Sequence, residues 1–284
     1  MKQDCPSSTA YGVAMARAAH QNLDHPKVFD DPMALRVIGA QGVAQVQSRR
    51  WLQSTRMARI FRAFIVARSQ FVEDELALAI GRGVRQYVVL GAGLDTFAYR
   101  NLYAKDNLRV YEVDYPATQA WKRKQLEAAG IVAPESLHFC PVDFETQDLF
   151  EVLIAAGFKP DEPSLFSWLG VTMYLRLETI IGTLKNIAVS SPRGTAVVFD
   201  YVTPLSTVGL FRRILLRLMM ARLAARGEPW LTFIETPALM AELKALGFTQ
   251  VGDLGQEDLN ARYFHNRADG LKVGRLGHLI SAQV

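Results

Sequence analysis

The chain has little cysteine: Cys5 and Cys140 are the only two in 284 residues. Two cysteines cannot form the multiple-disulfide scaffold of small secreted domains. Cys140 lies in the apolar run LHFCPV and is expected to be a small buried hydrophobe. The sequence also lacks a long uncharged apolar stretch, and its first residues, MKQDCPSSTA, lack the apolar segment of a secretory signal. We therefore expect a protein of the cytoplasm with no membrane span.

Charge of one sign is not in large excess either. Lys and Arg number 32 against 28 Asp and Glu, and half of the residues are hydrophobic, which is ordinary for a folded globular protein. Aromatic residues are not interleaved with the basic ones, so no nucleic-acid partner is predicted. The histidines are scattered without metal-ligand spacing, so no metal site is predicted; they are His20, His25, His138, His265 and His278.

The apolar pattern changes along the chain. The first 80 residues are predicted to be helical, and the last of these helices, 56–80, ends at Gly81 and Gly83. After it, short continuous apolar runs alternate with helical segments, which is typical of a buried parallel sheet with crossover helices. The predicted strands are 86–90, 108–114, 137–143, 164–169, 195–202, 248–254 and 277–284, and the predicted helices between them are 116–129, 146–156, 176–189 and 236–246.

Two segments depart from that alternation. The stretch between the last two strands is too polar and broken for a crossover helix, so we expect an antiparallel final pair at the sheet edge. Residues 203–235 form an insertion whose core, LFRRILLRLMMARLAAR, predicts a basic amphipathic helix. The expected organisation is a helical cap region over 1–80 and an α/β domain over 81–284, with the insertion adding to the cap. In an open α/β sheet, ligands bind at the carboxyl ends of the strands, which this cap would cover.

A glycine motif follows the first predicted strand in VVLGAGLDT, residues 88–96. Gly91, Ala92 and Gly93 permit a tight turn and close approach of a ligand, although a purely structural turn is also consistent with them. Position 96 is Thr, so the dinucleotide fingerprint G-x-G-x-x-G is incomplete. Asp95 would repel a pyrophosphate but could accept hydrogen bonds from a cationic or hydroxyl-bearing ligand.

Acidic residues end the next two predicted strands. Asp114, in VYEVDYP, could accept hydrogen bonds from ribose hydroxyls, or could cap the helix after Pro116. Asp143, in VDFE, could accept from an adenine amino group with Phe144 beside it, or could equally be a cap. The glycine loop and the two acids at successive strand ends form one constellation, which is more specific than any of its parts.

The chain resembles the leucine carboxyl methyltransferase family of S-adenosylmethionine (SAM)-dependent methyltransferases, including its bacterial and polyketide-pathway branches. The resemblance covers nearly the whole chain. It rests on the motifs FDDPMA (29–34), VARSQFVED with its Arg68, QYVVLGAGLDTFAYR (86–100), YEVDYPATQAWK (111–122), PVDFE (141–145), GVTMYL (170–175) and GEPW (227–230).

This resemblance implies a class I, Rossmann-like SAM methyltransferase fold with a seven-stranded, mostly parallel sheet. It implies that the GAG loop, Asp114 and Asp143 bind SAM, and that Arg68 binds the SAM carboxylate with help from a basic residue that we match to Arg17. There is one departure: Leu169 stands where the family usually has Glu, near the methionine ammonium of SAM. Phe97 likewise stands where many relatives have Arg.

The remaining candidates are less specific. Tyr174 and Trp230 could line the acceptor pocket or belong to the core, and His265 and Arg267 could border that pocket or lie in a solvated loop. Two basic stripes could be solvated helix faces or could attract an anionic acceptor or a membrane surface; they are Arg49, Arg50, Arg56, Arg59 and Arg62, and Arg212, Arg213, Arg217, Arg222 and Arg226.

The predicted activity is SAM-dependent O-methylation of a carboxylate on a small molecule that is anionic or amphipathic. We identify no catalytic base, since no His–carboxylate pair is evident, and this favours an acceptor that is already ionised. The alternatives are O-methylation of a phenol or enol of a polyketide or other secondary metabolite, and a non-catalytic SAM-binding protein.

Overall fold

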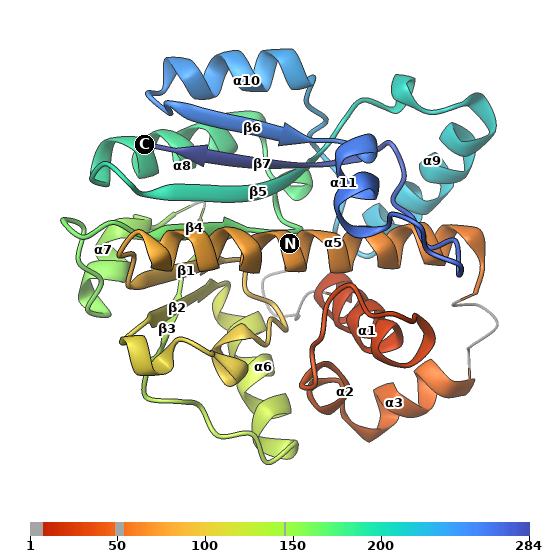
Figure 1. Ribbon diagram of the computed structural model, residues 1–284, viewed down its shortest axis with the longest axis horizontal. Helices are drawn as coiled ribbons and strands as arrows, with labels where there is room; N and C mark the ends of the chain where they lie inside the picture. Colours follow the sequence, from red (N-terminus) through yellow and green to blue (C-terminus); the bar gives the residue numbers. More distant parts are fainter. Residues whose placement is uncertain (1–7, 49–53, 145) are drawn as a thin grey trace.

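The computed structural model describes residues 8–48, 54–144 and 146–284. Cys5, Arg49, Arg50 and Glu145, singled out above, lie outside these ranges, as does the side chain of Arg212. The chain forms one seven-stranded sheet in the order β3-β2-β1-β4-β5-β7-β6 (Figure 1). The strands are β1 (Gln86–Leu90), β2 (Arg109–Asp114), β3 (Leu137–Pro141), β4 (Leu165–Trp168), β5 (Ala196–Val202), β6 (Gln250–Leu254) and β7 (Gly277–Gln283).

Strand directions confirm the predicted sheet. The pairings among β1 to β5 are all parallel, and β7 runs antiparallel to both of its neighbours, β5 and β6. Every residue of β1, β4 and β5 is buried, because helices cover both faces of these strands. This burial explains why the three strands are continuous apolar runs in the sequence.

Helices divide between the two faces of the sheet. Helix α5 (Arg56–Gly81) packs across one face, and α7 (Leu149–Ala155), α8 (Leu177–Ser190) and α10 (Thr236–Ala245) pack on the other. A third apolar cluster joins α1 (Ser8–Leu23), α2 (Ala34–Val37) and α3 (Gly39–Ser48) to α6 (Pro116–Ala128). The short 3-10 turns are η1 (Phe97–Arg100), η2 (Ala104–Asp106), η3 (Thr172–Tyr174) and η4 (Leu205–Thr207).

The helices that precede the sheet and the insertion after β5 lie at the same end of the molecule. Figure 1 shows α1, α2 and α3 together with α9 (Leu210–Ala225) at the end toward which β6 points. Because β5 runs the same way as β6, this is where the parallel strands have their carboxyl ends. No helix in the described part of the chain is both long and apolar enough to cross a bilayer.

One expectation about the C-terminal region is wrong. A helix, α11 (Gln256–Tyr263), does lie between β6 and β7. It begins at Gly255, whose backbone N–H donates to the carboxylate of Asp258 at 3.1 Å, and Leu259 is its buried contact with the core. Its other contacts are polar: Asn260 accepts from the N–H of Val273, and Arg262 and Tyr263 donate to Asp74 of α5. A helix held mainly by polar bonds to distant residues carries almost no apolar periodicity, so its sequence does not predict it.

Candidate functional site

The glycine loop after β1 is tightly folded and closely packed. Gly91 and Gly93 have φ of +67° and +50°, in the left-handed region that favours glycine. A Cβ on Gly91 would lie 2.3 Å from Val171, and one on Gly93 would lie 3.1 Å from Ala10 of α1. The N–H groups of Gly91 and Ala92 donate to the carbonyl of Val113 at 2.8 and 3.0 Å, so the loop folds back over the end of β2.

Asp114 at the end of β2 closes the other side of this loop. Its carboxylate accepts a hydrogen bond from the N–H of Gly93 and another, at 2.7 Å, from the N–H of Tyr115. Burial raises the pKa of Asp114, and these two backbone donors oppose that rise. The side chain is only half-buried. Both donors are backbone groups, so the carboxylate keeps lone pairs with which to accept hydroxyl donors.

Asp95 faces a buried arginine rather than solvent. Arg17 of α1 donates to the carbonyl of Leu94 and, at 3.3 Å, to the carboxylate of Asp95, whose other oxygen accepts from the N–H of Phe97 at 2.8 Å. Burial by itself would raise the pKa of Asp95, but the charges of Arg17 and Lys122 outweigh it and lower the pKa. Arg17 thereby joins α1 to the glycine loop, and its Nε has no hydrogen-bond partner among the described residues.

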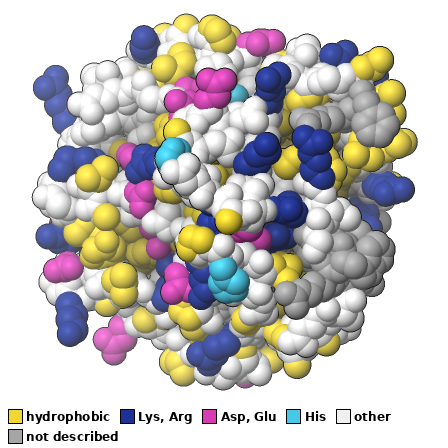
Figure 2. Space-filling view, turned by 45° about the vertical axis from the view of Figure 1, so that its right-hand side comes forward, with side chains coloured by type: hydrophobic (Ala, Val, Ile, Leu, Met, Phe, Trp, Pro, Cys, Tyr) yellow, Lys and Arg dark blue, Asp and Glu magenta, His cyan; other side chains and the backbone are white. Residues whose placement is uncertain are grey.

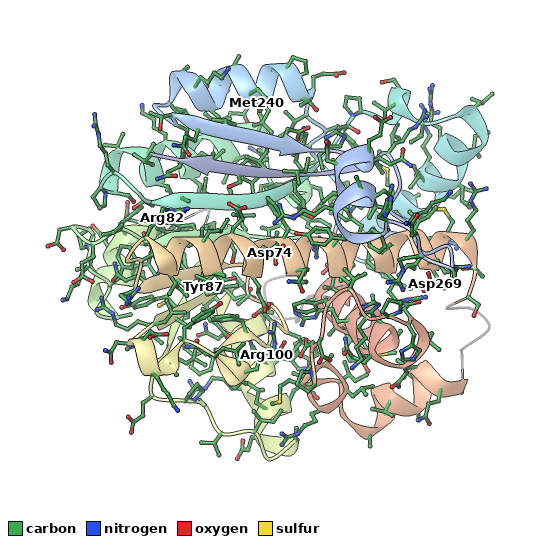
Figure 3. The ribbon with its side chains drawn as sticks, in the orientation of Figure 1. Asp74, Arg82, Tyr87, Arg100, Met240 and Asp269 are labelled. Atoms are coloured by element: carbon green, nitrogen blue, oxygen red, sulfur yellow. The ribbon has the colours of Figure 1, made fainter. Side chains whose placement is uncertain are left out.

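Asp31 of the FDDPMA motif supports the same loop. Its fully buried carboxylate accepts from the hydroxyl of Thr96 at 2.7 Å and lies 3.6 Å from Nε of Arg100. Arg100, labelled in Figure 3, also donates to Glu73 of α5 at 2.8 Å and lies 4.8 Å above the ring of Phe29. The glycine loop is therefore held to α5 and to the N-terminal helices by charged groups.

Arg68 of α5 lies under the end of β4. Its Nη1 donates to the carboxylate of Asp200 at 2.6 Å, and the other oxygen of Asp200 accepts from the N–H of Gly170, also at 2.6 Å. This is the one hydrogen bond that Arg68 makes among the described residues. A Cβ on Gly170 would lie 2.7 Å from Nη2 of Arg68, so the guanidinium lies directly against the chain there.

Asp200 is a residue that the sequence analysis missed. It is fully buried in β5, in the run AVVFDYV. An acid in the middle of such a strand requires a buried cation, because an unpaired buried charge is very costly, and this signal could have identified it. Leu169 is half-buried and packs on the core beneath α5. The carboxylate beside Gly170 is therefore supplied by the neighbouring strand, since position 169 has none.

Tyr174 and Trp230 meet in the same region. Tyr174 lies in η3. Burial raises the pKa of its phenol, while the nearby side chains of Thr9 and Trp230 and the charge of Arg68 oppose that rise. The segment that carries Trp230 is held alongside η3, because the N–H of Leu231 donates to the carbonyl of Met173 at 2.7 Å. The two aromatic residues are thus neighbours and lie near Arg68.

Asp143 and Phe144 lie after β3, whose end is tied to that of β2 by a 2.9 Å hydrogen bond from the N–H of Val142 to the carbonyl of Asp114. The carbonyl of Asp143 accepts from the backbone N–H of Gln147 at 3.0 Å, which is the geometry of a turn. The ring of Phe144 lies 6.4 Å from that of Trp168 at the end of β4. Phe144 therefore reaches across from the third strand toward the fourth.

Other candidates lie apart from this site. Phe97 is a buried core residue, His265 is exposed, and Arg267 bonds Asp269 and the carbonyl of Pro26. Among the described members of the first basic stripe, Arg56 is exposed, Arg59 donates to the carbonyl of Asp269, and Arg62 is buried. In the described part of the chain, no three His, Cys, Asp or Glu side chains are arranged to hold a metal. A surface hollow of about 650 Å³ lies at the amino ends of the strands, between Arg85, Arg109 and Glu135, away from the glycine loop.

The expectation that no histidine pairs with a carboxylate is wrong. Nδ1 of His20 lies 2.8 Å from Asp24, and Nδ1 of His278 lies 2.9 Å from Asp253. Each pair forms through the fold: His20 and Asp24 are one helical turn apart, and His278 and Asp253 lie on the adjacent strands β7 and β6. The spacing of His20 and Asp24 fits a helix and could have been recognised, whereas the pairing of His278 with Asp253 depends on the strand order and leaves no local signal.

Comparison with known proteins agrees with this geometry. A model of the leucine carboxyl methyltransferase family matches residues 10–188. The protein YktD of Bacillus subtilis (strain 168), named as a candidate SAM-dependent methyltransferase, is 30% identical over 308 residues, 99% of each chain. A Saccharopolyspora erythraea protein given the same description is 31% identical over 194 residues, 68% of this chain and 67% of its own.

Two solved structures share the fold over almost the whole chain. A candidate methyltransferase from Thermobifida fusca YX superposes with a TM-score of 0.59 at 13% identity, over 99% of this chain and 96% of its own. A DUF574 family protein from Streptomyces avermitilis MA-4680 gives a TM-score of 0.57 at 14% identity, over 96% of each chain. The sheet order, the glycine loop and the family match lead to one assignment: the chain belongs to the leucine carboxyl methyltransferase family of SAM-dependent methyltransferases, with the class I fold.

Proposed function

We propose that this protein transfers the methyl group of SAM to a carboxylate oxygen of a small molecule, forming a methyl ester. The observation that carries the proposal is that a buried cation, Arg68, lies beside an uncharged phenol, Tyr174, which could face the methyl acceptor. Arg68 has guanidinium donors that the described residues leave unused, and next to it Tyr174 is a phenol whose pKa is raised by burial. The residues 1–80 and 203–235 would cover this site in the proposal.

The residues at the strand ends fit SAM by their chemistry. Bound SAM would supply the electrophilic methyl group. Arg68 would bind its carboxylate with help from Arg17, since a guanidinium matches a carboxylate with two parallel hydrogen bonds. Asp114 would accept from the ribose hydroxyls, and Asp143 and Phe144 would contact the adenine. A Cβ would clash with Val171 at Gly91 and would crowd Ala10 at Gly93, so the loop of Gly91, Ala92 and Gly93 would present its backbone to the methionine portion.

The acceptor chemistry follows from what surrounds Tyr174. A carboxylic acid has an ordinary pKa near 4, so the acceptor is ionised at neutral pH and needs no base. A neutral Tyr174 phenol would donate a hydrogen bond to one acceptor oxygen and leave the other to attack, while Trp230 packs against the body of the molecule. The contribution of the protein would then be proximity and alignment, which can lower a barrier by roughly 7–11 kcal/mol.

The test is methyl transfer from radiolabelled SAM to a panel of carboxylic acids and phenols, with mass spectrometry to locate the methyl group. A methyl ester releases methanol in mild alkali, whereas a methyl ether does not. We expect an alkali-labile product and a rate that is nearly flat from about pH 6 to 9, since the acceptor stays ionised throughout. An alkali-stable product would contradict the carboxylate proposal.

One observation favours a second candidate function. Nδ1 of His278 is oriented by Asp253, and a histidine held in this way is suited to act as a general base for a phenol or enol. In that case turnover would rise steeply through one pKa and would be lost in His278→Ala but kept in His265→Ala. A protein that binds SAM but methylates no acceptor in the panel would instead support the non-catalytic alternative.

A further inference from the structure

Helix α9 carries an exposed apolar face. Leu210, Ile214 and Leu218 are four residues apart, so they lie on one side of the helix. Their side chains are 71%, 51% and 57% exposed, whereas Leu216 is buried and anchors the opposite side to the body of the protein. Single exposed apolar residues are common on protein surfaces, but three in register on one helix form a continuous stripe.

Arginines flank this stripe on both sides. With 3.6 residues per turn, Arg213 and Arg217 lie along one border of the stripe, and Arg222 and Arg226 lie along the other. The sequence of α9 contains no Asp or Glu. Figure 2, in which the right-hand side of Figure 1 comes forward, shows hydrophobic and basic side chains next to one another on the upper right, the side on which α9 lies.

This pattern discriminates between possible occupants. In a two-fold contact with a second copy, α9 on α9 would place arginines beside arginines with no carboxylate from either helix to neutralise them. A helix that lies in a membrane interface has the opposite requirement: an apolar stripe inserted among acyl chains, and cations along both borders that reach the anionic headgroups. The arginines and the apolar stripe of α9 therefore both complement an anionic membrane surface.

We propose that α9 binds the surface of anionic lipid membranes, with Leu210, Ile214 and Leu218 inserted and the flanking arginines on the headgroups. This interaction is separate from methyl transfer and requires neither SAM nor an acceptor. It would hold the segment that carries Trp230, which follows α9 directly, close to the bilayer.

The proposal can be tested with the full-length protein and sedimented vesicles of phosphatidylcholine, with and without phosphatidylglycerol. We expect binding that requires phosphatidylglycerol and weakens as salt is raised. The variant Ile214→Glu/Leu218→Glu should lower the affinity roughly tenfold or more. Its matched control is Val132→Glu/Val189→Glu, which adds the same charge at two exposed apolar residues elsewhere and should bind like the unmodified protein.

A second pair of variants tests the charges. Arg217→Gln/Arg222→Gln should weaken binding roughly tenfold or more, because each basic residue adds to the attraction toward an anionic surface. Arg82→Gln/Arg193→Gln removes two exposed arginines away from α9 and should have no effect. Circular dichroism would verify that all four variants remain folded.

Three outcomes would overturn the proposal. They are no binding to vesicles that contain phosphatidylglycerol, equal losses in the α9 variants and their controls, and an α9-dependent dimer in sedimentation velocity without vesicle binding. None of these outcomes bears on methyl transfer, because the assay contains no SAM.

Discussion

Two arginines on helix α5 are almost equally buried, yet they differ in how many of their hydrogen-bond donors are already used by other residues. Arg62 and Arg68 are 2% and 5% exposed. Arg62 donates from Nε and Nη2 to the two carboxylate oxygens of Asp24, at 2.6 and 2.8 Å. Among the residues that the structure describes, Arg68 makes a single hydrogen bond, to Asp200.

The other members of the Arg62 cluster, Asp24 and His20, are also bonded to protein groups. Asp24 also contacts Nδ1 of His20, and Nε2 of that histidine accepts from the N–H of Val28 at 3.0 Å. Arg68 instead lies against Gly170 with guanidinium donors unused by the described residues. Burial and residue type therefore do not distinguish the two arginines, whereas the number of donors that the described residues use does.

Breaking the closed cluster should have the largest effect. Arg62→Leu leaves Asp24 buried without its cation, and removal of one partner of a buried ion pair typically costs about 3–5 kcal/mol. We expect a loss of that size in the free energy of unfolding, measured with urea, and nearly unchanged SAM affinity in the protein that remains folded. The double variant Arg62→Leu/Asp24→Asn should recover part of the loss. A tenfold loss of SAM affinity in folded Arg62→Leu would contradict the distinction between the two arginines.

The same cluster predicts an acid-dependent loss of stability. Burial alone would raise the pKa of Asp24, but the hydrogen bonds from Arg62 and His20 outweigh it and lower the pKa to about 2. Since an unfolded Asp titrates near pH 4, the ionised form stabilises the fold above that pH, and the contribution disappears as the pH falls from about 4 to 2. It amounts to about 2 kcal/mol. In Asp24→Asn the free energy of unfolding should fall less steeply across this range; an unchanged slope would show that other carboxyl groups dominate.

A conservative substitution distinguishes the two arginines by binding. Arg68→Lys keeps the charge for Asp200 but loses the planar fork that a carboxylate of SAM would require. We expect SAM affinity to fall roughly tenfold by calorimetry, or about 1.4 kcal/mol, with only a small change in stability. Arg62→Lys is the matched control, on the same helix and equally buried, and should lower stability while leaving the affinity unchanged. Equal affinities in both variants would remove Arg68 from the SAM site.

The sequence predicts those elements of the fold that are determined by residues close together in the chain. Strand β1 was predicted with its observed bounds, and the antiparallel end of the sheet is confirmed. Both follow from apolar runs that are interrupted by glycine, proline and polar turns. The prediction failed at α11, whose one fully buried apolar residue is Leu259 and whose other contacts are mainly polar bonds to distant segments.

In the candidate site, too, residues in local motifs were predicted, whereas pairings between distant residues were not. The glycine loop and Asp114 each follow a recognisable strand and belong to motifs that can be identified in the sequence, and the structure joins them by a hydrogen bond. The partner of Arg68 lies 132 residues away in the sequence, and that of His278 lies 25 away. Such pairings are fixed by the order of strands and by how α5 crosses them, which no local pattern encodes. Whether the proposed residues bind SAM stays a prediction.

The smallest and most specific effect should come from Asp200, the residue that the sequence analysis missed. Asp200→Asn keeps the shape of the side chain, but an amide has one acceptor oxygen where the carboxylate has two. The N–H of Gly170 and Nη1 of Arg68 both need an acceptor, so one of them must face an NH2 group. We expect Arg68 to lose its fixed orientation and SAM affinity to fall a few-fold, about 1 kcal/mol.

Because Asp200 acts through Arg68, the double variant Arg68→Lys/Asp200→Asn should bind little worse than Arg68→Lys alone. The control is Asp253→Asn, which changes another strand carboxylate, bonded to Tyr201 and His278, and should leave SAM affinity as it is. Full additivity in the double variant would show that Asp200 acts on the cofactor site by a route that does not pass through Arg68.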